Sequence, residues 1–162
     1  MQWSKVGKSG TLPYETMLLG QHEALLGEKG RVSLPSRLRE SLGNRLIVTF
    51  GYEKSLIIVS EENWKALLEG TEDKPFIQQE ARETQRFLLG GASMVELDSK
   101  GRFVIPSYLR SFAGITSEVI FLGLSRYVEL WDKKAWVTYS THLENNIDTI
   151  AKKLLESGNM GK

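Results

Sequence analysis

The sequence contains one structural unit written twice. When it is shifted by 71 positions, Gly20–Gly43 lies over Gly91–Gly114, and ten of the 24 aligned residues are identical. Ordinary residue frequencies give about one or two identities by chance. Further along the shift becomes 72, which aligns Gly51 with Gly123 and Trp64 with Trp136. The identical residues of the first copy are Gly20, Leu26, Lys29, Gly30, Arg31, Pro35, Ser36, Leu38, Arg39 and Gly43. A repeat of this length in 162 residues predicts two small, similar units.

Each copy predicts the same order of elements. Two strands flank a charged turn, a short helix follows, and two further strands form a hairpin. The expected strands, paired by copy, are Gly20–Leu26 and Ala92–Leu97, Val32–Leu34 and Phe103–Ile105, Arg45–Phe50 and Glu118–Leu122, and Ser55–Val59 and Tyr127–Trp131. Gly51 and Gly123 are expected in the hairpin links.

The helices have recognisable start and stop signals. Proline suits the first helical position, so helices are expected to begin at Pro35-Ser36 and Pro106-Ser107. Gly43 and Gly114 are the expected C-terminal caps. A second helix in each copy is expected behind an N-cap residue, Ser60 or Asp132. Trp64 and Trp136 lie four residues after these caps, and we expect them to pack against the core.

These patterns predict five segments: an N-terminal extension at 1–16, a first unit at 17–68, a helical connector at 69–87, a second unit at 88–140, and a C-terminal helix and tail at 141–162. Gln78–Leu89 reads as the connector helix. The tail segment Asn145–Leu155 has apolar residues on one helical face, which predicts packing on its own chain or on a neighbour. The first dozen residues and Ser157–Lys162 are expected to be mobile.

Composition excludes several kinds of chemistry. The chain has no cysteine, so disulfides, thiol nucleophiles and cysteine zinc sites are absent. It has no long apolar run, which predicts a soluble, cytoplasmic protein without a membrane segment. The net charge is only +1, with 21 basic and 20 acidic residues, so a basic surface must be local or assembled from several chains.

No catalytic motif is visible. The sequence lacks a nucleophile elbow, a phosphate-binding glycine loop and a dinucleotide fingerprint. His22 and His142 stand alone, without metal-ligand spacing. The acidic pairs Glu61-Glu62 and Glu72-Asp73 are explained by a helix start and a solvated connector. We therefore expect neither enzyme activity nor a metal or other cofactor.

The two Lys-Gly-Arg turns are the candidate functional site. Gly30 and Gly101 permit a positive φ angle and a close backbone approach. The lysines supply compact charges for phosphate, and the arginines can fork onto guanine. We predict DNA contacts from Lys29, Arg31, Lys100 and Arg102, with backbone contacts from Arg37, Arg39 and Arg110. A solvated hairpin turn explains one such copy equally well, and duplication reproduces residues, so the second copy adds little independent support.

The stretches LLGEKGRVSLPSRLRESLG (Leu25–Gly43) and ELDSKGRFVIPSYLRSFAG (Glu96–Gly114) resemble the MraZ family of bacterial transcription regulators. The resemblance covers roughly Met17 to Tyr139. It implies an α+β, mainly β fold made of two tandem AbrB-like swapped-hairpin units that form a pseudo-dimer within one chain. It also implies a nucleoid-associated, ring-shaped homo-oligomer that binds double-stranded DNA at G-rich direct repeats. Those repeats would lie upstream of the chain's own operon, which contains division and cell-wall genes.

The first copy departs from the family pattern at one position. The motif aspartate is kept as Asp98, which we expect to shape the second turn, but it is Gly27 in the first copy. The first turn is therefore expected to be looser, with Glu28 as a partial replacement. The family's basic N-terminal start is also missing from Met17–Gly20, so any DNA contact from that position is either lost or moved to Lys5 or Lys8.

An alternative class is a protein-interaction module, such as an AbrB-like antitoxin. Such proteins usually have one unit and a disordered toxin-binding tail. The two units and the helical tail of this chain favour the regulator.

Overall fold

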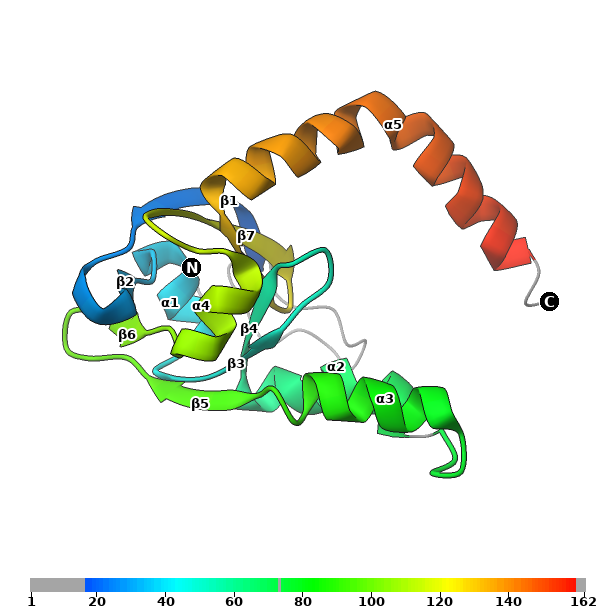
Figure 1. The fold of residues 1–162 in the computed structure, drawn as a ribbon, viewed down its shortest axis with the longest axis horizontal. Coiled ribbons are helices and arrows are strands. Elements are labelled where there is room, and N and C mark those ends of the chain that lie inside the picture. Colours follow the sequence, from blue (N-terminus) through cyan, green and yellow to red (C-terminus); the bar gives the residue numbers. More distant parts are fainter. Residues whose placement is uncertain (1–16, 73, 160–162) are drawn as a thin grey trace, which may run out of the picture.

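The computed structural model describes residues 17–72 and 74–159 (Figure 1). It is an α+β fold with a mainly antiparallel sheet, as expected. The strands are β1 (Leu18–Leu25), β2 (Arg31–Ser33), β3 (Arg45–Phe50), β4 (Leu56–Ser60), β5 (Ser93–Glu96), β6 (Arg102–Val104), β7 (Glu118–Ser125) and β8 (Val128–Asp132). The helices are α1 (Ser36–Leu42), α2 (Glu61–Glu72), α3 (Gln79–Leu88), α4 (Ser107–Ala113) and α5 (Lys133–Asn159), with a short 3-10 turn at Glu28–Gly30.

The two copies exchange strands. The six-stranded sheet has the order β1-β7-β8-β4-β3-β5, so β1 of the first copy pairs with β7 of the second, and β5 of the second pairs with β3 of the first. The remaining strands, β2 and β6, form a separate two-stranded ribbon, again with one strand from each copy. Neither copy therefore completes its own sheet, and the two fold as one body.

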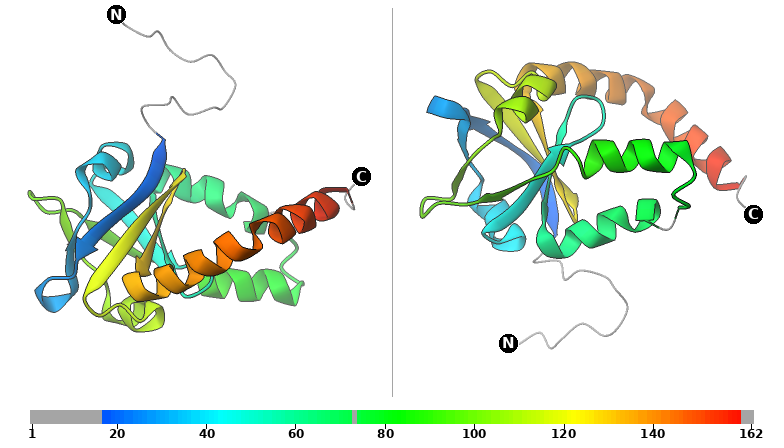
Figure 2. Two further views of the ribbon diagram at one scale, coloured as in Figure 1. Left: turned by 90° about the horizontal axis from the view of Figure 1, so that it is seen from above. Right: turned by 60° about the horizontal axis from the view of Figure 1, so that its bottom comes forward.

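The main core lies where the two copies meet. Buried side chains of β2, α1 and the link between them (Val32, Leu38 and Leu34) pack with their counterparts Phe103, Leu109 and Ile105 from β6, α4 and the link between those. One face of β3, β4, β7 and β8 closes this core. The helices α1 and α4 lie beside the ribbon, while α2, α3 and α5 extend from the other side of the sheet (Figures 1 and 2).

The predicted tryptophans pack on the outer face of the sheet, in two smaller clusters. Trp64 of α2 packs against Ile47, Ile57 and Val59. Trp136 of α5 packs against Ile120, Leu122 and Trp131, and its ring lies 5.3 Å from that of Trp131. Because both faces of the central strands are covered, these strands read as continuous apolar runs in the sequence.

Local signals explain where the helices begin and end. Ser60 accepts a hydrogen bond from the backbone N–H of Asn63 at 3.2 Å, and Asp132 accepts one from Ala135 at 3.2 Å. Both residues are therefore the N-caps that the sequence predicts. Gly43 and Gly114 are the C-caps of α1 and α4, as predicted.

The predicted position of Gly123 is wrong. It lies inside β7, where it pairs with Gly20, and not in the hairpin link, whereas Gly51 does follow the end of β3. A Cβ on Gly123 would meet the backbone of Leu18 and Leu19 on β1, with the Leu18 carbonyl carbon at 2.5 Å. Glycine at this position lets two strands from different copies approach closely.

The helices do not follow all the expected boundaries. α2 continues to Glu72, and the connector contains α3, which matches the predicted connector helix. α5 is one continuous helix from Lys133 to Asn159, so it runs through position 140, where we expected the second unit to end. Of the segments expected to be mobile, the first dozen residues and residues 160–162 lie outside the described part of the chain.

One half-buried carboxylate opposes folding at neutral pH. Burial raises the pKa of Glu129 on β8 most, and the charge of Glu53 adds to this, so the pKa lies above its ordinary value although hydrogen bonds with Ser55 and Trp131 lower it. Because the folded pKa lies above the unfolded one, the folded state binds more protons, and stability rises as the pH falls through the folded pKa.

Glu129→Gln is therefore expected to raise the melting temperature at pH 7, since glutamine still accepts the Trp131 N–H bond without a charge. The gain in melting temperature should shrink as the pH falls toward 4.5, the ordinary pKa of a glutamate side chain. Thermal unfolding across this range measures it, with exposed Glu62→Gln as the control. A gain that persisted unchanged at pH 4.5 would contradict this account.

Candidate nucleic-acid interface

The β2–β6 ribbon carries two arginines on its outer face. In its register Arg31 pairs with Val104, and Ser33 pairs with Arg102. Val32 and Phe103 point into the core and are 1% and 3% exposed. Since side chains alternate along a strand, the four paired residues share the outer face. Arg31 and Arg102 are diagonal neighbours, which places their Cα atoms about 7–8 Å apart.

The Lys-Gly-Arg turns lie at opposite ends of this ribbon. The carbonyl of Gly30 accepts a hydrogen bond from the N–H of Ile105, and the carbonyl of Gly101 accepts one from Leu34, both at 2.9 Å. Each turn is therefore fixed by a strand of the other copy. Lys29 and Lys100 extend the line of positive charge beyond the two arginines at either end.

Asp98 organises the second turn. One carboxylate oxygen, Oδ1, accepts hydrogen bonds from the N–H groups of Lys100 and Arg102, both at 2.9 Å. The other, Oδ2, accepts a bond from Nε of Arg102 at 2.8 Å. The bond uses Nε, so it leaves the terminal guanidinium nitrogens of Arg102 outside this contact. Asp98 therefore holds both the backbone of the turn and the base of the arginine side chain.

The backbone hydrogen bond from Arg102 lowers the pKa of Asp98 most, helped by the bond from Lys100 and by the charge of Arg102, although burial opposes this. The pKa of Asp98 is therefore lower in the folded state than in the unfolded state. The stability that Asp98 adds is present above about pH 3.9, the unfolded pKa, and is lost as the pH falls through the folded pKa. The turn therefore keeps its charged form throughout the neutral range.

The first turn has the same backbone bond but no equivalent side chain. The N–H of Gly27 donates to the carbonyl of Arg31 at 2.7 Å, as Asp98 does to Arg102 at 2.9 Å. No side chain of the described residues replaces the Asp98 carboxylate here, and Glu28 is exposed. Lys29 has a φ of 59°, a left-handed conformation that Lys100 does not share. The looser first turn that the sequence predicts fits this geometry.

Two arginines expected to contact the DNA backbone, Arg39 and Arg110, pack over the opposite turns. A Cβ on Gly30 would lie 2.5 Å from Nε of Arg110, and a Cβ on Gly101 would overlap the Arg39 guanidinium. Arg110 also donates from Nε to the carbonyl of Ile105 at 3.1 Å. Each helix arginine thus lies half-buried against the turn glycine of the other copy. These contacts support the turns, and they explain why glycine is needed there.

The remaining predicted residues lie away from the ribbon. Arg37 on α1 is exposed and lines a hollow with Gly20 and His22 of β1. His22 bonds to the carbonyl of Leu19, and His142 contacts Asn146 on α5. Lys5 and Lys8 lie outside the described residues. Within residues 17–72 and 74–159, no group of acidic and histidine residues could hold a metal, and no helix is long and apolar enough to cross a membrane.

Sequence reasoning missed Ser33 and Val104, the other two outward residues of the ribbon. Val104 is 44% exposed although it is apolar. The signal was available, because each lies two residues after a turn arginine, and alternate residues of a strand share one face.

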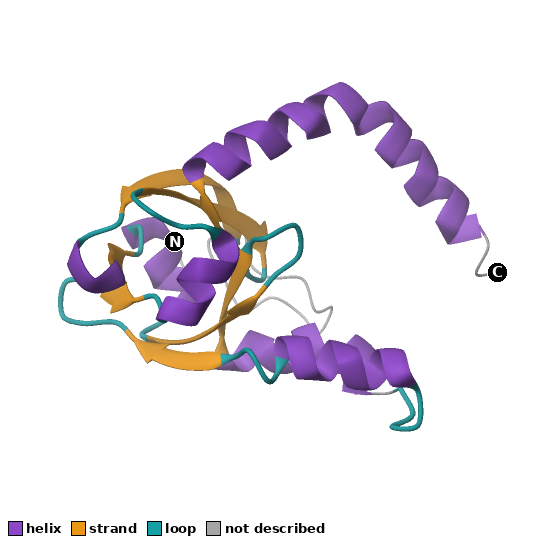
Figure 3. Ribbon diagram, viewed as in Figure 1, coloured by secondary structure: helices purple, strands orange, loops and turns teal. Residues whose placement is uncertain are grey.

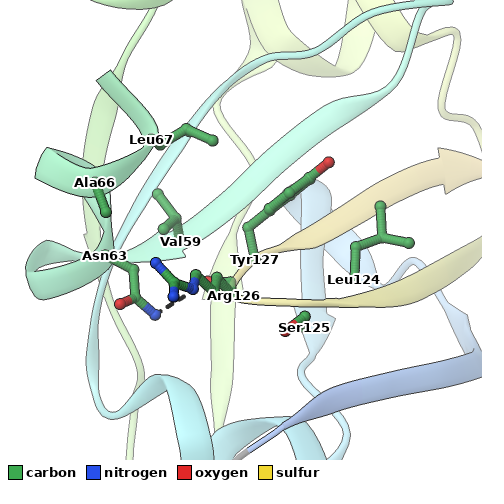
Figure 4. Close-up of a pocket in the computed structure, with 8 residues that line it drawn as sticks. All are labelled: Val59, Asn63, Ala66, Leu67, Leu124, Ser125, Arg126 and Tyr127. Carbon is green, nitrogen blue, oxygen red and sulfur yellow. Dashed lines mark hydrogen bonds between the residues drawn. The ribbon is translucent and has the colours of Figure 1, made fainter. Parts of the chain in front are cut away.

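An apolar pocket of about 260 Å³ lies on the other side of the sheet, between α2 and the β7–β8 hairpin (Figure 4). Val59, Leu67, Leu124 and Tyr127 line it, and Asn63 donates to the Arg126 carbonyl at its rim at 3.1 Å. It is not part of the ribbon site.

Asp98→Ala is expected to lower the free energy of unfolding, because the three hydrogen bonds that Asp98 accepts within the turn are removed. Gly27→Asp is expected to have the opposite sign, since it restores the missing carboxylate before Arg31. Urea unfolding of both variants measures the change. Destabilisation by Gly27→Asp would show that the first turn cannot adopt the geometry of the second.

By its fold and site, the chain is a duplicated α+β protein whose two similar halves exchange strands and present a paired cationic ribbon. The family of MraZ proteins, described as antitoxin-like, matches it twice, over residues 17–87 and 88–157. This chain is 40% identical to a protein of Caldanaerobacter subterraneus subsp. tengcongensis over 138 residues, which cover 85% of this chain and 96% of that protein. It is 39% identical to a protein of Thermoanaerobacter sp. over 138 residues, with the same coverage.

A relative from Caldicellulosiruptor bescii is 38% identical over 142 residues, which cover 88% of this chain and 99% of that protein. All three relatives are named transcriptional regulator MraZ. The chain belongs to the MraZ family.

Proposed function

We propose that this protein is a DNA-binding transcriptional regulator that acts at the nucleoid, and that the outer face of the β2–β6 ribbon is its DNA-binding surface. The relatives' name supports the regulatory role. The observation that carries the proposal is the ribbon register, which brings Arg31 and Arg102 from different copies onto one face. A two-stranded antiparallel ribbon fits the major groove, where arginine recognises guanine.

The strand exchange supports a second part of the proposal. Two AbrB-like units form a swapped-hairpin pseudo-dimer within one chain. β1 of the first unit pairs with β7 of the second, and β5 of the second unit pairs with β3 of the first. Each unit also contributes one strand to the ribbon. The two turns thereby form one site with approximate two-fold symmetry.

The target we propose is a set of short G-rich direct repeats upstream of the chain's own operon of division and cell-wall genes. A single ribbon offers few phosphate contacts, so its binding should be weak and sensitive to salt. Several ribbons held in a ring of identical chains would engage consecutive repeats, and the raised effective concentration would strengthen binding. A chain of net charge +1 can in this way present a strongly basic assembled surface.

The C-terminal part of α5 supports assembly. Ile147, Ile150 and Leu154 are 53%, 37% and 71% exposed, and with Leu143 they are spaced by four, three and four residues along one helical face. The C-terminal part of α5 extends away from the sheet in each of the views (Figures 1 and 2). Figure 3 shows that it is a single helix throughout. An apolar stripe of this kind is a surface for a neighbouring copy.

A mobility-shift titration tests the function. The probes are a duplex from the chain's own upstream region, containing the G-rich repeats, and a shuffled duplex of the same length. Specific retardation that weakens steeply between about 50 and 200 mM salt is expected. If the repeat duplex is not retarded more than the shuffled one at low salt, the proposal is wrong.

Ile147→Glu/Leu154→Glu is expected to reduce the oligomer to smaller species, because buried carboxylates would oppose the contact. Light scattering measures the mass, with Thr149→Glu on the opposite face of α5 as the matched control. The smaller species should also bind the multi-repeat duplex more weakly. An unchanged mass would show that assembly does not use α5.

A further inference from the structure

The outer face of the ribbon is not symmetric. The approximate two-fold relates Arg31 to Arg102, which are identical, but it also relates Ser33 to Val104, which are not. One half of the face therefore pairs an arginine with an apolar side chain, and the other half pairs an arginine with a hydroxyl. The two copies therefore share the outward arginine of each three-residue strand. They differ at the other outward position, which is Ser33 in one strand and Val104 in the other.

Val104 has no role in the fold that explains its exposure. The core-facing residues of the ribbon are Val32 and Phe103, and Val104 is 44% exposed on the opposite face. Single exposed apolar residues are common on protein surfaces, so exposure alone proves nothing. Its position is what matters, because it lies directly across from Arg31 and within reach of whatever Arg31 binds.

DNA offers one apolar group in the major groove, the C5 methyl of thymine. Arginine recognises guanine by its O6 and N7 atoms, and an apolar side chain recognises the thymine methyl. A serine hydroxyl can donate to or accept from any base, so it selects weakly. The pair of Arg31 and Val104 thus suits a guanine next to a thymine, whereas the pair of Ser33 and Arg102 suits a guanine alone.

We propose that Val104 is a specificity-determining residue that contacts a thymine methyl beside the guanine bound by Arg31. The contact makes the two halves of the ribbon unequal, so one subunit recognises a non-palindromic element. Direct repeats consist of such elements, all in the same orientation. This inference rests on the proposed function, and its test is designed so that the two can fail separately.

The experiment measures binding of the full-length protein to the repeat duplex by fluorescence anisotropy. Each thymine is replaced in turn by uracil, which removes the methyl and keeps every hydrogen-bonding group. Wild-type affinity is expected to fall about three- to fivefold for thymines on one side of the guanines, as for the removal of one buried methyl group. Val104→Ser should bind thymine DNA with that lower affinity and no longer distinguish uracil.

Ser33→Ala is the matched control at the equivalent position of the first copy, and it should keep the uracil effect. The wild-type measurement needs no substitution, so a poorly folded Val104 variant cannot obscure the outcome. If wild-type protein binds every uracil duplex as tightly as the thymine duplex, the inference is wrong. The proposed function survives that outcome as long as the repeats are still bound specifically, and it fails only if they are not.

Discussion

Replacing Arg31 and Arg102 together by alanine is expected to lower affinity for the repeat duplex about 100-fold or more, since each arginine that forks onto guanine contributes about 1–3 kcal/mol. The ribbon presents both side chains on one face, so the double variant removes the main base contacts of a subunit. Anisotropy titration at fixed salt measures the decrease. Affinity and salt dependence equal to wild type would show that the ribbon is not the DNA-binding surface.

The matched control is Lys65→Ala/Arg86→Ala, which removes two positive charges from exposed positions on α2 and α3. It should leave affinity nearly unchanged, because these charges lie away from the ribbon. The pair Lys29→Ala/Lys100→Ala gives a second comparison. If the lysines bind phosphates, it should reduce the slope of log affinity against log salt by about 0.9 for each phosphate no longer neutralised, without relaxing sequence preference.

The single arginine variants are expected to differ. Asp98 holds Nε of Arg102 at 2.8 Å and so fixes the side chain before DNA arrives, whereas Arg31 has no equivalent partner among the described residues. A preorganised side chain loses less entropy on binding. Arg102→Ala should therefore impair binding at least as much as Arg31→Ala. The reverse order would show that the looser first turn provides the stronger contact.

Gly123→Ala is expected to destabilise the fold by about 3 kcal/mol, at the upper end of typical overpacking effects. The added Cβ would meet backbone atoms of β1, 2.5 Å from the Leu18 carbonyl carbon and 2.7 Å from Leu19 Cα. Backbone cannot rotate aside as a side chain can, so β1 must move away from β7. The ladder that ties the first copy to the second is weakened as a result.

Urea unfolding measures this destabilisation, and Gly158→Ala on α5 is the control because a Cβ there meets nothing within 4 Å. Alanine is also the better helix former, so the control should be neutral or slightly stabilising. If Gly123→Ala unfolded at the same urea concentration as wild type, the close approach of β1 and β7 would not be needed for stability.

Much of the local structure follows from the sequence. Alternating and continuous apolar runs predict the strands, and Ser60 and Asp132 predict the helix starts, because capping depends on residues only three positions apart. The turn cations and Asp98 were also predictable, since Asp98 bonds within its own turn. These features are local, so neighbouring residues suffice to determine them.

The alignment of the repeat misplaced Gly123 for a related reason. Matching it with Gly51 uses residue identity, but the sheet register pairs Gly123 with Gly20 across the two copies. A strand's register is decided by its partner, and the partner lies about a hundred positions away in the chain.

The sequence by itself therefore determined that the chain is a duplicated α+β unit with two cationic turns, because repetition, caps and apolar patterns depend on near neighbours. Only the tertiary structure decided how the copies combine. It placed β1 on β7 and β2 on β6, brought Arg31 beside Arg102, and packed Arg39 and Arg110 over the opposite glycines. These contacts join residues far apart in the chain, and they are selected by burial of a shared core that neither copy can form alone.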